Sequence, residues 1–162
     1  MTSAHDVRAY EYVNLPYARV SELLRRDALG VFQRATVRAT ARARELVSTM
    51  RVEVGPVELG ADVVVRVASV SEEPSRVLGP RTRLCLEWEA SQRPQLFPTM
   101  TATLDVYALA PGETQVDFHG NYTPPLGAVG AVLDAAVGHK IAQATVHRFV
   151  KEIAERLRVE MT

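Results

Sequence analysis

The sequence predicts an α+β fold in which a curved antiparallel sheet packs against one long C-terminal helix. Between residues 49 and 123 the apolar residues recur with a period of two, in segments separated by short turns. After Pro125 they recur at helical spacing as far as about Arg158. Because the sheet and the helix are each apolar on one side only, we expect them to pack those sides together.

The residues before the sheet predict one strand and two shorter helices. Residues 7–14 (VRAYEYVN) alternate apolar and polar side chains and are rich in strand formers. Pro16 follows where a helix can begin, and the next apolar residues lie at helical spacing. Residues 27–47 fit two interpretations, because Ala alternates with Thr and Arg as in a strand, whereas Ala and Arg favour helices. We predict a second helix there, with a strand as the alternative.

Five further segments predict an antiparallel meander, which gives about six or seven strands in all. They are residues 50–59, 61–70, 81–90, 97–109 and 113–122. One face of this sheet is predicted to be apolar, with Val67, Leu84, Leu86, Trp88, Met100, Ala102, Leu104, Val106, Val116, Phe118 and Tyr122. The other is predicted to be polar, with Arg83, Cys85, Glu87, Thr103, Asp105, Asp117 and His119. A terminal helix of roughly thirty residues would be about 45 Å long, enough to cross the sheet.

Composition excludes several classes of protein. The chain has 162 residues, 47% of them apolar, with 19 basic and 19 acidic side chains. The balanced charge removes the positive field on which nucleic-acid binding and attraction to anionic membranes depend, so we expect neither partner. No apolar run is long enough for an integral membrane segment, and the first residues do not resemble a signal peptide, so we expect a cytoplasmic protein. Its oligomeric state is expected to be a monomer or a homodimer.

Motifs with well-defined chemistry are absent from the sequence, which lacks GxSxG, HExxH, GxGxxG, CxxC and a P-loop. We therefore expect no metal site and no cofactor. Cys85 is the single cysteine and is expected to be an incidental thiol on the polar face. His139 and His147 are too far apart on the helix to hold a metal by themselves, so we expect them to act at the surface or as helix caps.

The order of elements resembles that of the START-like, helix-grip superfamily, which includes polyketide cyclases and small lipid carriers. The likeness covers nearly all of residues 1–162, read as a single domain. It is carried by the strand GETQVDFHGNY, by NYTPPLG before the helix and by the terminal AVGHKIAQATVHRFVKEIAERL. The resemblance implies a helix-grip fold with an apolar cavity between the sheet and the C-terminal helix, and hence a hydrophobic or aromatic small molecule as partner.

Residues on the two apolar surfaces are candidates to line that cavity. They are Trp88, Met100, Leu104, Phe118, Tyr122, Leu133, Val137 and Ile141, each of which could equally be ordinary core. The helix adds a second observation, since Gly127, Gly130 and Gly138 lie in its first half. Each interior glycine costs about 1 kcal/mol relative to alanine, so three of them indicate close packing, a kink or room for a ligand.

Three functions remain open at this level. The first is binding or carriage of a hydrophobic small molecule, such as a lipid or a polyketide-like compound, without catalysis. The second is a cyclase or aromatase that uses the same cavity, with Tyr122 and Asp134 as acid and base candidates. Asp134 fits a solvent-exposed position on the helix as well as an inward one. The third is an interaction module in which Arg34, Arg38 and Arg42 form a basic ridge or simply a solvated helix face.

Overall fold

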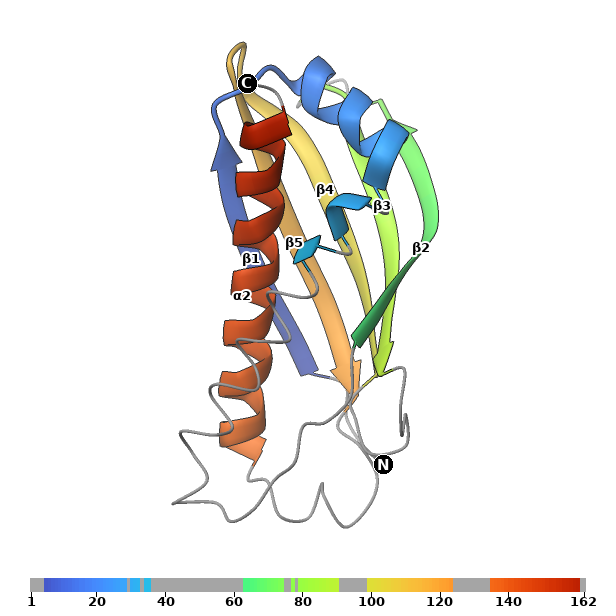
Figure 1. Ribbon diagram of the computed structural model, residues 1–162, viewed down its shortest axis with the longest axis vertical. Coiled ribbons are helices and arrows are strands. Elements are labelled where there is room, and N and C mark those ends of the chain that lie inside the picture. The colour runs from blue at the N-terminus through green and yellow to red at the C-terminus, as the bar shows by residue number, and fades with distance from the viewer. Residues whose placement is uncertain are drawn as a thin grey trace.

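The computed structural model describes residues 5–28, 30–32, 34–35, 63–74, 77, 79–90, 99–123 and 135–160. The described elements are β1 (His5–Val13), β2 (Val63–Glu73), β3 (Arg81–Ala90), β4 (Thr99–Ala110), β5 (Glu113–Thr123) and α2 (Ala135–Glu160). The five strands form one antiparallel sheet in the order β1-β5-β4-β3-β2, which curves beside α2 (Figure 1). The predicted α+β fold is confirmed. The strand predicted at residues 50–59 lies outside the described part of the chain.

The first predicted helix is present at residues 17–28. It begins directly after Pro16, whose carbonyl accepts hydrogen bonds from the backbone N–H groups of Arg19 and Val20. Of the second predicted helix, residues 30–32 and 34–35 are helical and the rest lies outside the described residues. Arg34 is exposed and donates to the Gly30 carbonyl at 3.3 Å, whereas Arg38 and Arg42, the other members of the predicted ridge, are not described.

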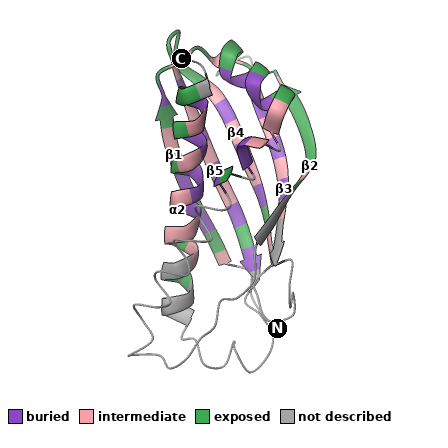
Figure 2. Cartoon of the chain, in the orientation of Figure 1, coloured by how far each residue is buried: buried purple, intermediate pink, exposed green. Residues whose placement is uncertain are grey.

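The period of two in the sheet is borne out by burial. In β5, Val116, Phe118, Gly120 and Tyr122 are buried, whereas the alternate residues 115, 117, 119 and 121 keep contact with solvent. We call the face toward α2 the inner face and the opposite one the outer face; Figure 2 shows buried residues along both the strands and α2. One departure occurs in β2, where a bulge between Val67 and Ser69 shifts the register so that Val70 pairs with Leu84.

Helix α2 lies along the β1 edge of the sheet (Figure 1). The side-chain amide of Gln143 donates to the Arg8 carbonyl at 2.7 Å. Arg158 donates to the Tyr12 carbonyl at 2.5 Å. An edge strand otherwise presents unpaired backbone groups to other chains, so these two contacts protect the β1 edge.

The core fills the space between the inner face and the C-terminal half of α2. Phe149 lies with its ring centroid 5.9 Å from that of Phe32 and 5.9 Å from that of Phe118. All three side chains are fully buried, as are Leu24, Leu104, Ile153 and Leu157. The C-terminal half of α2 therefore contributes large side chains to the core. Within the described ranges, no helix is long and apolar enough to cross a membrane.

Candidate functional site

The inner face is organised in rows that run across the strands. Strand register places Val7, Gly120, Ala102, Leu86 and Val67 in one such row. These side chains are aliphatic or absent, and the two in the middle of the sheet, at Ala102 and Gly120, are the smallest. The adjacent rows hold larger side chains at these two strands, with Phe118 and Leu104 on one side and Tyr122 and Met100 on the other.

Burial differs between the two ends of this face. We call the end formed by Leu24, Phe32, Phe149 and Leu157 the packed end, because all four side chains are fully buried. We call the other end, formed by His5, Met100, Gly120, Tyr122 and His139, the Tyr122 end. There Met100 is only partly buried although it faces inward, and so is Val67 in the neighbouring row. Apolar side chains thus keep contact with solvent on the inner face at the Tyr122 end.

Gly120 is the point of closest approach at the Tyr122 end. A Cβ at this position would lie 2.8 Å from the Met100 sulfur, 2.9 Å from the Phe118 ring and 3.3 Å from a Val7 methyl group. The space that a side chain would occupy is therefore taken by a thioether and a ring edge. The side chain of Met has three rotatable bonds and adapts to irregular spaces, so the Met100 sulfur is the part of this contact that can move.

Tyr122 is the polar residue of the site. Its hydroxyl lies 3.1 Å from Nδ1 of His139 on α2, in hydrogen-bond contact. Its ring stacks with His5 on β1 at a centroid distance of 5.3 Å, and with His139 at 6.3 Å. Tyr122 itself is buried and His139 is exposed. The pair thus connects the apolar inner face to solvent.

The protonation state of this pair follows from burial. Desolvation raises the pKa of the Tyr122 hydroxyl above its ordinary value, so the phenol is neutral at physiological pH. A neutral phenol donates one hydrogen bond and accepts others. If His139 carries its proton on Nε2, Tyr122 donates to Nδ1; if Nδ1 is protonated, the ring donates to the phenol. The hydroxyl remains able to contact a further polar group in either state.

The packed end has its own polar group. The Thr82 hydroxyl lies 2.8 Å from the hydroxyl of Tyr17 and 2.7 Å from that of Ser21. Thr82 and Ser21 are both buried, and the cluster ties helix 17–28 to β3. These hydroxyls satisfy one another, so this cluster has a structural role.

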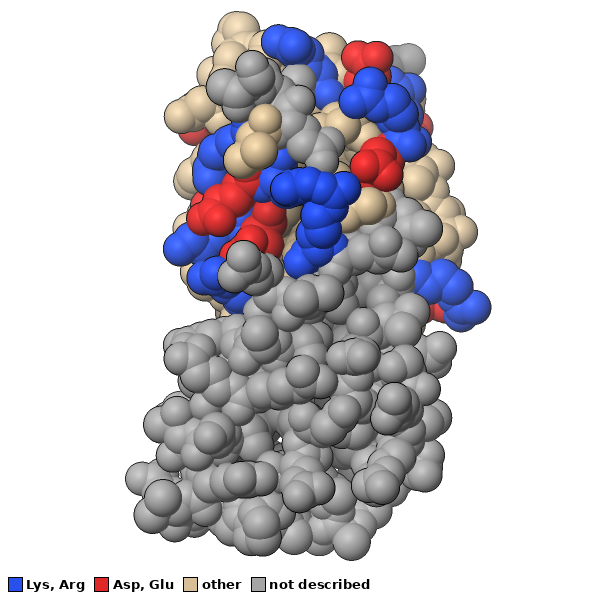
Figure 3. Space-filling model, viewed as in Figure 1, with Lys and Arg blue, Asp and Glu red and all other residues tan. Residues whose placement is uncertain are grey.

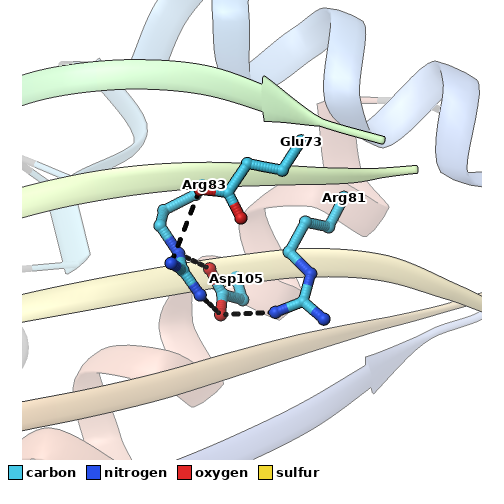
Figure 4. Close-up of polar contacts among 4 residues, drawn as sticks. All are labelled: Glu73, Arg81, Arg83 and Asp105. Atoms are coloured by element: carbon cyan, nitrogen blue, oxygen red, sulfur yellow. Dashed lines mark hydrogen bonds and ion pairs between the residues drawn. The ribbon is translucent and has the colours of Figure 1, made fainter. Parts of the chain in front are cut away.

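The outer face carries paired charges. Arg83 donates to both carboxylate oxygens of Asp105 at 2.8 and 2.9 Å, and Arg81 and Glu73 complete the group (Figure 4). The hydrogen bonds and the charge of Asp105 raise the pKa of Arg83. Cys85 is on this face, as predicted, and partly exposed. In the view of Figure 3, charges of both signs are interspersed over the described surface.

Cross-strand neighbours on this face also affect one another. Asp117 pairs in register with Asp105, and burial and this second carboxylate raise the pKa of Asp117. Burial and then the Asp117 charge raise the pKa of the Tyr107 phenol. In the described part of the chain, no group of three or more His, Cys, Asp or Glu side chains could hold a metal ion.

The predicted lining residues divide into three groups. Met100, Leu104, Phe118 and Tyr122 lie on the inner face. Trp88, Val137 and Ile141 lie within β3 or α2, but their side chains are not among those described. Leu133 and Asp134 lie outside the described residues. Leu104 and Phe118 are fully buried, so of these four Met100 and Tyr122 are the ones at the accessible end.

His139 was assigned from the sequence to the surface or to a helix cap. The structure shows it exposed, but bonded to the one phenol of the inner face that the sequence singled out. The available signal was the need of a buried tyrosine hydroxyl for a partner. The sequence spacing between residues 122 and 139 could not identify His139 as this partner, because the contact depends on how α2 lies against β5.

Comparisons with known proteins agree on the fold. No protein-family model and no curated protein matches the chain. A crystal structure of a Thermus thermophilus protein matches with a TM-score of 0.55 at 15% identity, covering 98% of this chain and 100% of the other. The Zhui aromatase/cyclase from a Streptomyces species reaches 0.49 at 15% identity, covering 99% and 97%. A START superfamily protein from Mycobacterium smegmatis reaches 0.46 at 9% identity, covering 98% and 99%. At such identities the likeness concerns the fold alone, and the Thermus thermophilus match agrees with the predicted layout of a curved antiparallel sheet and a long C-terminal helix.

Proposed function

We propose that this helix-grip domain binds or carries one hydrophobic small molecule, lipid-like or polyketide-like, on the inner face at the Tyr122 end. The observation that carries the proposal is the incomplete burial of Met100 in the middle strand of the sheet, whereas Leu104 on the same strand and Phe149 at the packed end are fully buried. Ligand sites combine a mainly apolar lining with a few polar groups, and Tyr122 with His139 supplies such a group here.

Binding at this site depends on the small size of Ala102 and Gly120. A ligand that displaces the Met100 sulfur from Gly120 would contact both small residues and the Phe118 ring edge. Such a movement needs a change of side-chain rotamer and leaves the backbone of β4 and β5 in place. Ala102 and Gly120 would then form the floor of the binding site.

The test is a fluorescence titration with 2-methylnaphthalene, an apolar probe, on the wild type and on two substitutions in neighbouring positions of β4. Ala102→Phe fills the inner face, and Thr103→Phe adds the same ring to the outer face. We expect Ala102→Phe to weaken binding roughly tenfold or more, which is about 1.4 kcal/mol, and Thr103→Phe to leave it unchanged.

A second inner-face substitution keeps the test valid if Ala102→Phe does not fold. Val67→Phe adds a ring to the same row at a half-buried position near the β2 edge and should also weaken binding. Failure of the folded wild type to bind the probe, or equal loss in Thr103→Phe, would overturn the proposal. Native mass spectrometry of gently purified protein would identify a bound molecule directly.

The hydrogen bond between Tyr122 and His139 favours a second candidate function, a cyclase or aromatase on the same face. A neutral phenol can polarise a ligand carbonyl while an imidazole accepts a proton from the adjacent carbon. Exchange of the α-protons of 2-tetralone in D2O, followed by NMR, tests this chemistry. Exchange at the buffer rate in the presence of the wild type would remove the candidate, whereas acceleration that is lost in Tyr122→Phe would support it.

A further inference from the structure

The Tyr122 end has a polar group at one point and apolar groups beside it. Met100 lies beside Tyr122 in the same row, and the next row toward the packed end holds Gly120 and Ala102; none of these three residues has a side-chain oxygen or nitrogen. The Tyr122 hydroxyl and the His139 ring lie at the margin of this apolar region. A molecule lying over Gly120 and Ala102 would therefore meet its first hydrogen-bonding partner at Tyr122.

The geometry of Tyr122 is fixed from two sides. His5, its register partner on β1, stacks against the ring at 5.3 Å, and His139 holds the hydroxyl at 3.1 Å. A phenol held in this way loses little further freedom when it bonds to a ligand, which favours recognition of a defined atom. The hydrogen bond to His139 uses one of the bonding positions of the hydroxyl, and the oxygen has others.

We propose that Tyr122 and His139 together recognise a single oxygen, a hydroxyl or carbonyl, at one end of an otherwise apolar ligand. The inference rests on the proposed binding of a hydrophobic molecule to the inner face and adds the chemical class of that molecule. Tyr122 makes the contact with the ligand oxygen. His139 is a positioning residue that orients the hydroxyl, and His5 sets the plane of the ring.

The burial of Tyr122 is consistent with this role. Its pKa is raised, so the hydroxyl keeps its proton and offers both a donor and an acceptor to a neutral ligand oxygen. A ligand without oxygen would bury this margin of the site without a hydrogen bond. The basis of discrimination is therefore the net contribution of one hydrogen bond, since the Tyr122 hydroxyl keeps its bond to His139 in both cases.

The experiment compares two probes of nearly the same shape, 2-naphthol and 2-methylnaphthalene, in titrations of the wild type, Tyr122→Phe and His139→Ala. We expect the wild type to bind 2-naphthol about fivefold more tightly than 2-methylnaphthalene, the ratio for one hydrogen bond. Tyr122→Phe should reduce the ratio to about one and leave the affinity for 2-methylnaphthalene unchanged. His139→Ala should give an intermediate ratio.

Tyr17→Phe is the matched control, because Tyr17 is also a tyrosine with a hydrogen-bonded hydroxyl but belongs to the packed end. It should keep the wild-type preference. Equal binding of the two probes by the wild type, or an unchanged ratio in Tyr122→Phe, would overturn this inference while leaving the proposed function intact. Absence of binding of either probe to the folded wild type would overturn both.

Discussion

The packed end and the Tyr122 end of the inner face use the same strands to opposite effect. At the packed end, rings from three segments, Phe32, Phe118 and Phe149, meet with no exposed surface. At the Tyr122 end, the same strands carry Ala102, Gly120 and a half-buried Met100. The polar groups differ in the same way, since Thr82 is enclosed by two other hydroxyls and Tyr122 is bonded to an exposed histidine.

The difference teaches that a sheet apolar on one whole face need not have one function along its length. Side-chain size decides where the face becomes core and where it keeps an accessible surface. The helix contributes as well, because among its described side chains the fully buried ones, such as Phe149, Ile153 and Leu157, belong to its C-terminal half. Stability is therefore expected to depend on the packed end and ligand contact on the Tyr122 end.

Removal of a ring from the packed end should have the largest effect on stability. Phe149→Ala deletes a fully buried ring between Phe32 and Phe118 and should lower the free energy of unfolding by about 3–5 kcal/mol. Met100→Ala, the comparison at the other end, should cost less than about 2 kcal/mol, because Met100 is only partly buried. Urea unfolding followed by circular dichroism measures both. Equal losses would contradict the contrast between the ends.

The polar groups of the two ends should also differ in their contribution to the stability of the fold. Thr82→Val leaves the hydroxyls of Tyr17 and Ser21 without their common partner and should cost about 1–3 kcal/mol. Tyr122→Phe should cost about 1 kcal/mol or less, because exposed His139 regains water as a partner. Thermal unfolding of both variants tests this order, and a larger loss in Tyr122→Phe would reverse it.

On the outer face, substitution of Asp117 should change stability by a smaller amount, and the change should depend on pH. Burial, and next the Asp105 carboxylate, raise the pKa of Asp117 in the folded protein. A carboxyl group with a raised pKa in the folded state favours folding most at a pH below its unfolded pKa of about 3.9, where it is protonated in both states. This contribution to stability is lost as the pH rises through the higher pKa of the folded state. Asp117→Asn should therefore gain stability relative to the wild type between acidic and neutral pH, by up to about 0.5 kcal/mol.

Measurement of urea unfolding at several pH values tests this sign. Gln115→Ala is the control, since residue 115 lies on the same face of β5 and introduces no titrating group. A wild type that gains stability relative to Asp117→Asn as the pH rises through this range would contradict the assignment. The packed end should show no corresponding change, because Leu24, Phe32, Phe149 and Leu157 carry no titrating group.

Local features of this fold were evident from the amino-acid sequence. The period of two in β3 and β5 specified which side chains face inward, because successive side chains of a strand point to opposite faces. The turn at residues 110–113 and the helix after Pro16 were likewise evident from local chemistry. In β2 a bulge between Val67 and Ser69 places Val70 opposite Leu84, a register that alternation alone does not reveal.

Only the tertiary structure decided which inward residues remain accessible and which polar groups meet. Met100 and Leu104 follow the same pattern along β4, yet one is half-buried and the other fully buried. The difference depends on where α2 and residues 17–35 cover the sheet, which the alternation within β4 does not specify. Tyr122 and His139 meet for the same reason, because a contact between a strand and a helix depends on how the helix lies on the sheet, and periodicity within each element carries no information about that.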